Sequence, residues 1–168
     1  MAEFWSNNDR GYRIRLWVDQ VGQDIQNNTS QVRLRLALLN TTTTFAQYQC
    51  SAYVEFNGQR LNWSGSPSVL SWYQTVQLID QTITVRHADD GSGVFSVRAH
   101  FNGSGGWSPV NLDIGNQQIT LTTIPRGSSV RVSDGFIGNQ VDISIDKKVG
   151  SATHTLRYSW YNKQGKIA

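Results

Sequence analysis

Residues 12–19 read Tyr-Arg-Ile-Arg-Leu-Trp-Val-Asp, and this stretch decides the fold class of the chain. Apolar side chains occupy every second position and alternate with Arg13, Arg15, Trp17 and Asp19. A period of two residues is that of a β-strand with one face in a hydrophobic core and the other face outward. The stretch therefore predicts a half-buried strand.

The same alternation recurs along the chain, between clusters of turn-forming residues. The apolar rows lie at Val32–Leu38, Tyr48–Phe56, Leu70–Leu78, Ile83–His87, Phe95–Phe101 and Ile119–Ile124. No 3.6-residue period lasts long enough to predict a helix. About seven short strands in antiparallel order predict an all-β fold, an antiparallel β-sandwich of jelly-roll or immunoglobulin-like type.

One connection can be worked out from parity. If the row Ile83–His87 shares a face with the row Phe95–Phe101, residue 87 pairs with 95 and residue 85 pairs with 97. Such pairing needs a loop of odd length, and residues 90–92 with Gly91 in the left-handed conformation provide one. We therefore predict a bulged or longer hairpin between these two rows.

Composition and charge exclude several classes of protein. The 168 residues are 38% hydrophobic and 11% aromatic, but only 16% charged, against about 25% in an average chain. Disordered chains are rich in charge and poor in aromatic residues, so these fractions indicate a folded protein. The formal charge of +3 is uneven, since residues 1–125 carry a net −1 and residues 126–168 carry +4. This shift suggests two domains, and no basic stripe predicts a nucleic-acid partner.

The chain shows no targeting or membrane signal. It begins without the basic start and apolar run of a signal peptide, and nowhere does it contain 18 consecutive apolar residues. We expect synthesis in a bacterial cytoplasm and no membrane insertion. The single cysteine, Cys50, alternates with apolar neighbours, so it cannot form an internal disulfide and is expected to be a buried thiol.

A domain boundary is predicted at Ile124-Pro125-Arg126-Gly127, because proline ends strand pairing and the alternation restarts at Val130. Residues 1–124 would form the sandwich. Residues 125–168 would form a second module of about three strands, too few for an independent sandwich. Either that module is truncated at residue 168, which we favour, or its missing strands come from elsewhere.

Two sequence motifs resemble a known family. The segment His87-Ala-Asp-Asp-Gly-Ser-Gly93 and the segment Leu121-Thr-Thr-Ile-Pro-Arg126 resemble an H-x-x-D-G hairpin followed by L-T-x-I-P-R in tail and baseplate proteins of siphophages that infect Gram-positive bacteria. Phe4-Trp5-Ser6 and residues 61–66 are similar to minor structural proteins of streptococcal phages. The resemblance covers essentially the whole chain. It implies that residues 125–168 begin an immunoglobulin-like module, and it supplies no catalytic residue.

The strongest candidates for binding are two tryptophans set among small polar residues. Trp63 lies in Asn-Trp-Ser-Gly-Ser and Trp107 in Gly-Gly-Trp-Ser-Pro. Such rings could contact a sugar or a partner protein, with Asn62, Asn102 and Ser104 hydrogen-bonding to hydroxyl groups. The alternative, which we favour, is that the rings plug the open ends of the sandwich.

A second candidate is a basic face. Arg13 and Arg15 on one strand, and Arg33 and Arg35 on another, would form a grid that could bind an acidic subunit or a phosphate-bearing wall polymer. A solvated face is the more common outcome. Because like charges directly across strands repel, the two pairs should be offset or interleaved with Asp19.

Catalytic and metal sites are not indicated. The three histidines, His87, His100 and His154, lie outside any nucleophile motif. Asp89-Asp90-Gly91 lacks the remaining ligands of a calcium loop and fits a turn instead. We therefore expect no enzymatic activity, no metal and no cofactor.

These observations predict a non-enzymatic virion protein, namely a structural or attachment module of the phage tail tip or baseplate. Its partners would be other tail proteins or further copies of itself. The alternative is a receptor-recognition module that binds the cell-wall saccharide of the host.

Overall fold

The computed structural model describes residues 1–42, 49–67, 73–103, 109 and 111–126. It also gives the backbone of the strands Ser128–Val132, Ile143–Lys147, Tyr161–Asn162 and Gly165–Lys166. The chain separates into two compact units, Met1–Arg126 and Gly127–Ala168. Throughout the described part every regular element is a β-strand, so the predicted all-β class is confirmed.

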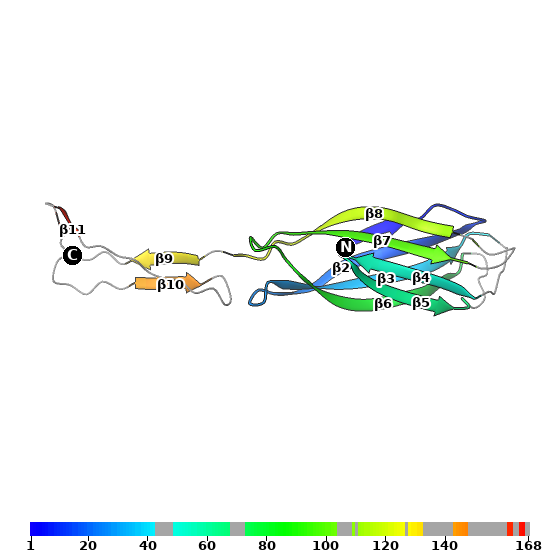
Figure 1. Ribbon diagram of the computed structural model, residues 1–168, viewed down its shortest axis with the longest axis horizontal. Helices are drawn as coiled ribbons and strands as arrows, with labels where there is room; N and C mark the ends of the chain where they lie inside the picture. The colour runs from blue at the N-terminus through cyan, green and yellow to red at the C-terminus, as the bar shows by residue number, and fades with distance from the viewer. Residues whose placement is uncertain are drawn as a thin grey trace. The chain divides into compact units, whose positions relative to one another are not determined.

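The first unit is a sandwich of two antiparallel four-stranded sheets (Figure 1). Sheet A has the order β1-β2-β3-β6, with bounds Ala2–Trp5, Tyr12–Asp24, Thr29–Asn40 and Thr75–Arg86. Sheet B has the order β5-β4-β7-β8, with bounds Gln59–Gly65, Cys50–Phe56, Gly93–Asn102 and Asn111–Leu121. The predicted β-sandwich is therefore confirmed.

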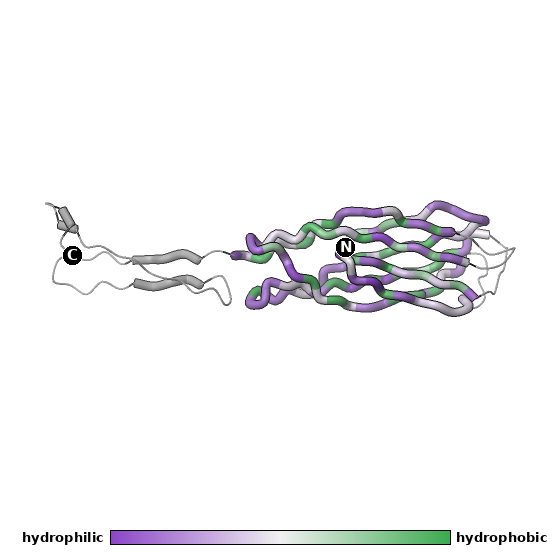
Figure 2. The backbone as a smooth tube through the Cα atoms, in the orientation of Figure 1, coloured by the Kyte–Doolittle hydropathy of each residue, from purple (hydrophilic) through white to green (hydrophobic). Residues whose placement is uncertain are grey.

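The inward rows of the two sheets form one core, and Figure 2 shows the alternation of hydrophobic and hydrophilic residues along the strands. The row that begins at Tyr12 and the row that begins at Val32 face the interior from sheet A. Sheet B contributes Val54, Phe56 and Phe101, which have no exposed surface. Each such large side chain contributes about 1.5–3 kcal/mol through burial, so the alternation supplies the main stabilisation of the fold. Cys50 is buried in this core, as predicted.

Strand β6 corrects the predicted element pattern. The rows Leu70–Leu78 and Ile83–His87 were expected as two strands. Residues 70–72 lie outside the described residues, and Thr75–Arg86 forms a single strand that includes the rest of both rows up to Arg86. A β-bulge shifts the β3–β6 register, so Leu78 and Ile79 are both buried and the inward parity changes from even to odd positions. The Gln77 side chain donates to the carbonyl oxygens of Leu36 and Ile79 at this bulge.

The predicted hairpin between residues 83–87 and 95–101 is wrong. Strand β6 pairs with β3 in sheet A, whereas β7 pairs with β4 and β8 in sheet B, so residues 87–92 cross from one sheet to the other. Two strands that face each other across the core bury their apolar rows as well as two strands of one hairpin do. The local prediction for the turn is right, since Gly91 has a φ of +83°.

The second unit is described by its backbone. Strand β9 (Ser128–Val132) pairs antiparallel with β10 (Ile143–Lys147), and β11 (Tyr161–Asn162) pairs with β12 (Gly165–Lys166). The first two strands include the predicted apolar positions at Val130 and Ile143. The predicted row at 153–160 lies outside the described residues. The assignment of residues 125–168 to an immunoglobulin-like module stays a prediction.

Candidate functional site

Apart from Trp63, the described candidate residues lie on the two outer faces of the sandwich. The four arginines lie on sheet A, and Asn62 and Asn102 lie on sheet B. Trp107 and Ser104 lie outside the described residues. The two outer faces differ in chemistry.

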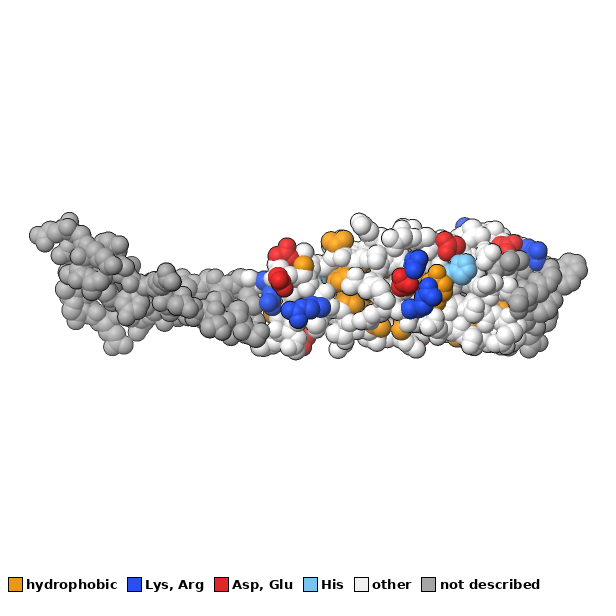
Figure 3. All heavy atoms as spheres, viewed as in Figure 1, with side chains coloured by type: hydrophobic (Ala, Val, Ile, Leu, Met, Phe, Trp, Pro, Cys, Tyr) orange, Lys and Arg blue, Asp and Glu red, His pale blue; other side chains and the backbone are white. Residues whose placement is uncertain are grey.

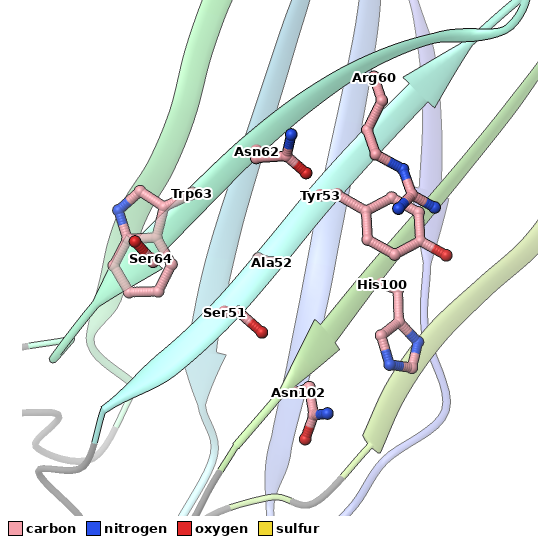
Figure 4. A pocket seen from close by; sticks show the side chains of 9 residues that line it. All are labelled: Ser51, Ala52, Tyr53, Arg60, Asn62, Trp63, Ser64, His100 and Asn102. Carbon is pink, nitrogen blue, oxygen red and sulfur yellow. The ribbon is translucent and has the colours of Figure 1, made fainter.

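The outer face of sheet B carries a hollow of about 410 Å³ (Figure 4). We call it the polar hollow; its lining residues are Ser51, Ala52, Tyr53, Arg60, Asn62, Trp63, Ser64, His100 and Asn102. The volume lies within the range of about 300–1,000 Å³ that is usual for small-ligand sites. The structure thus brings Asn62 and Asn102 together at a common site.

Strand register explains how the polar hollow is built. Ser51 of β4 lies between Ser64 of β5 and Asn102 of β7. Two residues further along β4, Tyr53 lies between Asn62 and His100. Because outward side chains of adjacent strands align in rows, these six residues form two rows of three on one surface.

Tyr53 is fixed in place by a cation and a second ring. The Arg60 guanidinium carbon lies 3.8 Å from the centre of the Tyr53 ring, a cation–π contact. The His100 ring is stacked beside Tyr53, with 5.8 Å between ring centroids, and its Nδ1 lies 3.2 Å from Asp113 Oδ1. Tyr53 is therefore a firmly positioned wall of the hollow.

A charged row flanks the polar hollow. Glu55 lies between Arg60 and Arg98 on the neighbouring strands, with N–O distances of 3.4 Å and 2.9 Å. The hydrogen bonds from Arg98 lower the pKa of Glu55 below its usual value, so this carboxyl is ionised at neutral pH. Figure 3 shows charged side chains and a histidine on this face of the first unit.

Trp63 lies both at the polar hollow and at the core. It borders the hollow, but it belongs to the inward row of β5 and packs against the buried core cluster together with Leu61. That the ring also plugs an open end of the sandwich, the interpretation favoured from the sequence, stays a prediction.

The outer face of sheet A carries a stack of alternating arginines and tryptophans. We call it the arginine–tryptophan face; its members are Trp5, Arg13, Arg15, Trp17 and Arg35. The guanidinium of Arg15 lies between the two rings, 4.8 Å from the centre of Trp5 and 4.3 Å from that of Trp17. Arg13 contacts Trp5 and Arg35 contacts Trp17, which completes the stack.

The arginines are offset, and most are neutralised. Arg15 pairs across the sheet with Ala37, whereas Arg35 pairs with Trp17. The arginines therefore do not face each other directly across the strands, which is the offset predicted from the sequence. Three ion pairs cross this face, namely Arg15–Glu3 at 2.6 Å, Arg33–Asp80 at 2.6 Å and Arg35–Asp19 at 2.8 Å. The grid therefore carries little net positive charge, which weakens the interpretation as a site for phosphate-bearing polymers.

The two motifs that resemble siphophage tail proteins, residues 87–93 and 121–126, contact each other at the C-terminal end of the first unit. The Gly91 carbonyl accepts hydrogen bonds from the Ile124 amide and from His87 Nδ1, each at 2.9 Å. In the neutral imidazole, Nε2 then accepts a hydrogen bond from the Ser30 hydroxyl at 2.7 Å. Gln20 completes the set: its side-chain amide donates to Ser30, and its oxygen accepts from the Thr122 amide.

We call these linked bonds the exit network, formed by Gln20, Ser30, His87, Gly91, Thr122 and Ile124. It fixes the last residues of the first unit against the turn that joins the two sheets. The bonds of His87 are buried, whereas the bond between Gln20 and Thr122 is exposed. A buried polar group stabilises a single arrangement when its partners are all present. His87 is only 3% exposed, and both of its ring nitrogens form hydrogen bonds. Its role in the first unit is therefore structural.

The described residues contain no group of three or more His, Cys, Asp or Glu side chains that could hold a metal ion. Asp90 accepts a hydrogen bond from the Ser92 amide, which makes Asp89–Gly91 a turn, as predicted. In the same part of the chain there is no helix with the length and hydrophobicity needed to cross a bilayer.

Sequence reasoning missed Tyr53, Arg60 and His100 as members of a site. The alternation around Cys50 already places Tyr53 on the outer face, but only strand pairing brings it beside Asn62 and His100. Trp5 was likewise missed, because strand β1 is too short to show a clear period.

No curated protein matches the chain. The family described as "Siphovirus protein of unknown function (DUF859)" matches residues 1–168. This match confirms the expected siphophage origin and supports a virion protein, while the tail location and the streptococcal host stay predictions. Because the match spans the whole length, the chain belongs to this siphovirus protein family.

Proposed function

We propose that the chain is a non-enzymatic virion protein, a structural or attachment module of the siphovirus tail tip or baseplate. The observation that carries the proposal is the arginine–tryptophan face. Tryptophan and arginine are the residues most enriched at the energetic centres of protein interfaces. Here they are held in place by cation–π contacts and ion pairs before any partner binds, which lowers the entropic cost of association.

The chemistry of this face favours a protein partner over a polyanion. Trp5 is 39% exposed, so it offers ring surface for burial. Arg15 and Arg35 are already paired with carboxylates, so little unpaired charge is left to attract nucleic acid or teichoic-acid phosphate. The partner would be another tail protein or a second copy of this chain.

The absence of enzymatic function is part of the proposal. Of the described histidines, His87 is sealed inside the exit network, and His100 stacks on Tyr53. Neither arrangement resembles a nucleophile activated by an adjacent base. Incubating the folded chain with purified cell wall and finding released soluble sugar would contradict this part.

Location is tested by immunogold electron microscopy of purified virions with an antibody against the chain. Label at the distal end of the tail supports the proposal. Virions that contain no label, with a positive signal from the isolated chain, would overturn it.

The role of the face is tested by a phage that carries both Trp5→Ala and Trp17→Ala. We expect the copy number of the protein per virion, measured by quantitative mass spectrometry, to fall at least tenfold, since hot-spot truncations cost about 2 kcal/mol or more. Arg98→Ala on sheet B is the control and should leave the copy number unchanged.

A second candidate function is recognition of a host cell-wall saccharide. The specific observation that favours it is the polar hollow, where Asn62 and Asn102 lie beside Tyr53. The two functions use opposite faces of the sandwich and are compatible in one protein.

A further inference from the structure

Four polar side chains of the polar hollow make no hydrogen bond within the described part of the chain. Ser51, Ser64, Asn62 and Asn102 are exposed, and none of them bonds through its side chain to another described residue. Elsewhere on these sheets, polar side chains such as Gln20 and Gln77 are used to complete the fold. The hollow thus gathers amide and hydroxyl groups that are not used in hydrogen bonds among the described residues.

The spacing of these groups suits one or two sugar rings. Adjacent strands lie about 4.8 Å apart, and outward residues along a strand repeat every 6.6 Å or so. Ser64 and Asn102 lie on either side of β4, so the row spans roughly 10 Å. Asn62 and His100 form the next row, one repeat away along the strands, with Tyr53 between them (Figure 4).

Charge around the hollow decides the class of saccharide. Arg60 and Arg98 share the carboxylate of Glu55, and His100 faces Asp113. The two guanidinium groups are balanced by the carboxylates of Glu55 and Asp113, so the side chains around the hollow offer no cluster of unpaired guanidinium groups that would favour a phosphate or a uronate. Arg60 is further occupied over the ring of Tyr53.

We propose that the polar hollow binds a neutral, hydroxyl-rich saccharide unit. Ser51, Asn62, Ser64 and Asn102 would hydrogen-bond with its hydroxyls, and Tyr53, whose ring is already covered by Arg60, would border the bound unit. The inference deepens the second candidate function and does not depend on the arginine–tryptophan face. It names the ligand class and assigns the site to β4, β5 and β7.

The inference is tested by NMR titration of the isotope-labelled chain with purified wall polysaccharides of streptococci, separated into neutral and phosphate-bearing fractions. The neutral fraction should shift the amide signals of residues 51–53, 62–64 and 100–102 in a saturable way. Asn62→Ala and Asn102→Ala should each weaken binding about 3- to 10-fold, the usual effect of one lost hydrogen bond.

Gln118→Ala is the matched control, because Gln118 is an exposed amide on β8 of the same sheet, away from the hollow. It should leave the affinity unchanged.

The remaining outcomes would overturn different parts of the inference. Binding that persists in both asparagine variants would preserve a saccharide function but overturn this site. Binding of the phosphate-bearing fraction alone, with strong salt dependence, would overturn the ligand class. Failure of both fractions to bind would overturn the inference together with the second candidate function, while the tail-assembly proposal would still stand on its own immunogold and copy-number tests.

Discussion

At Gly91 the chain follows a path that a side chain would block. The residue has a φ of +83°, and a Cβ built there would lie 1.9 Å from the carbonyl oxygen of Ile124. Gly58 has nearly the same φ, +81°, but nothing lies within 4 Å of its Cβ position. The two glycines therefore separate the cost of backbone conformation from the cost of a steric clash.

We expect Gly58→Ala to destabilise the fold by about 1–2 kcal/mol, the cost of a left-handed residue with a side chain. Gly91→Ala should cost a further 1–3 kcal/mol or so, because the exit network must open to admit the methyl group. Urea unfolding of both variants measures the difference. Equal losses in the two variants would show that the contact between Gly91 and Ile124 is not tight in solution.

Glu55 and Asp80 are among the carboxylates that make stability depend on acidic pH. The pKa of Glu55 is lowered from 4.5 by hydrogen bonds from Arg98, and that of Asp80 is lowered from 3.8 by hydrogen bonds from Arg33. A folded-state pKa below the unfolded value stabilises the protein above the unfolded value, and this contribution is lost as pH falls through the folded value. The sensitive window therefore lies below about pH 4.5.

The unfolding midpoint should fall as pH is lowered from about 5 to 3, and Glu55→Gln should flatten that dependence. Asp80→Asn, on the opposite sheet, should flatten it further and additively, since the two sites share no partner. Thermal unfolding followed by circular dichroism across this pH range provides the measurement. Parallel pH profiles for the wild type and the double variant would contradict the assignment of this pH dependence to Glu55 and Asp80.

Among the strands, β8 shows how the edge of a sheet is closed. The Asn7 side chain donates to the Asn111 carbonyl at 3.1 Å and accepts from the Asp113 amide at 2.8 Å. These are backbone groups on the free edge of sheet B, where unpaired groups would otherwise invite pairing with another chain. A residue that lies between β1 and β2 of sheet A thus protects an edge of sheet B.

Asn7→Ala should lower the free energy of unfolding by about 1 kcal/mol and speed hydrogen exchange at the Asp113 amide. Asn102→Ala is the control, because that exposed side chain makes no hydrogen bond to another described residue, and its effect should stay within roughly 0.5 kcal/mol. Chemical denaturation and exchange measured by NMR test both effects. Unchanged exchange at Asp113 would show that Asn7 does not protect the edge.

Considered as a whole, the first unit contains its own core. Among the described residues, every member of the buried core cluster lies between Tyr12 and Leu121, inside Met1–Arg126. The exit network is likewise complete within this range. Burial of one contiguous core is what allows a domain to fold independently.

A fragment of residues 1–126 should therefore unfold in one cooperative transition, with a midpoint within about 5 °C of that of the first unit in the full chain. Calorimetry of both proteins provides the comparison. A fragment that fails to fold, or that melts in a broad non-cooperative transition, would show that the second unit is needed to stabilise the first.

The sequence by itself determined which residues face inward, because a strand repeats every two residues and burial requires apolar side chains. The rows at Tyr12–Val18, Val32–Leu38 and Phe95–Phe101 were predicted on this basis and are buried. The left-handed turn at Gly91 was also predictable, since it depends on local backbone chemistry alone.

Only the tertiary structure decided which strand pairs with which. Parity assigns a residue to a face but does not name its neighbour, so residues 83–87 and 95–101 were predicted as a hairpin, although they belong to different sheets. The polar hollow depends on the same information, because Ser51, Tyr53, Asn62 and His100 meet only through the pairing of β4 with β5 and β7. Pairing is set by the packing of the entire core, and no local stretch of sequence contains it.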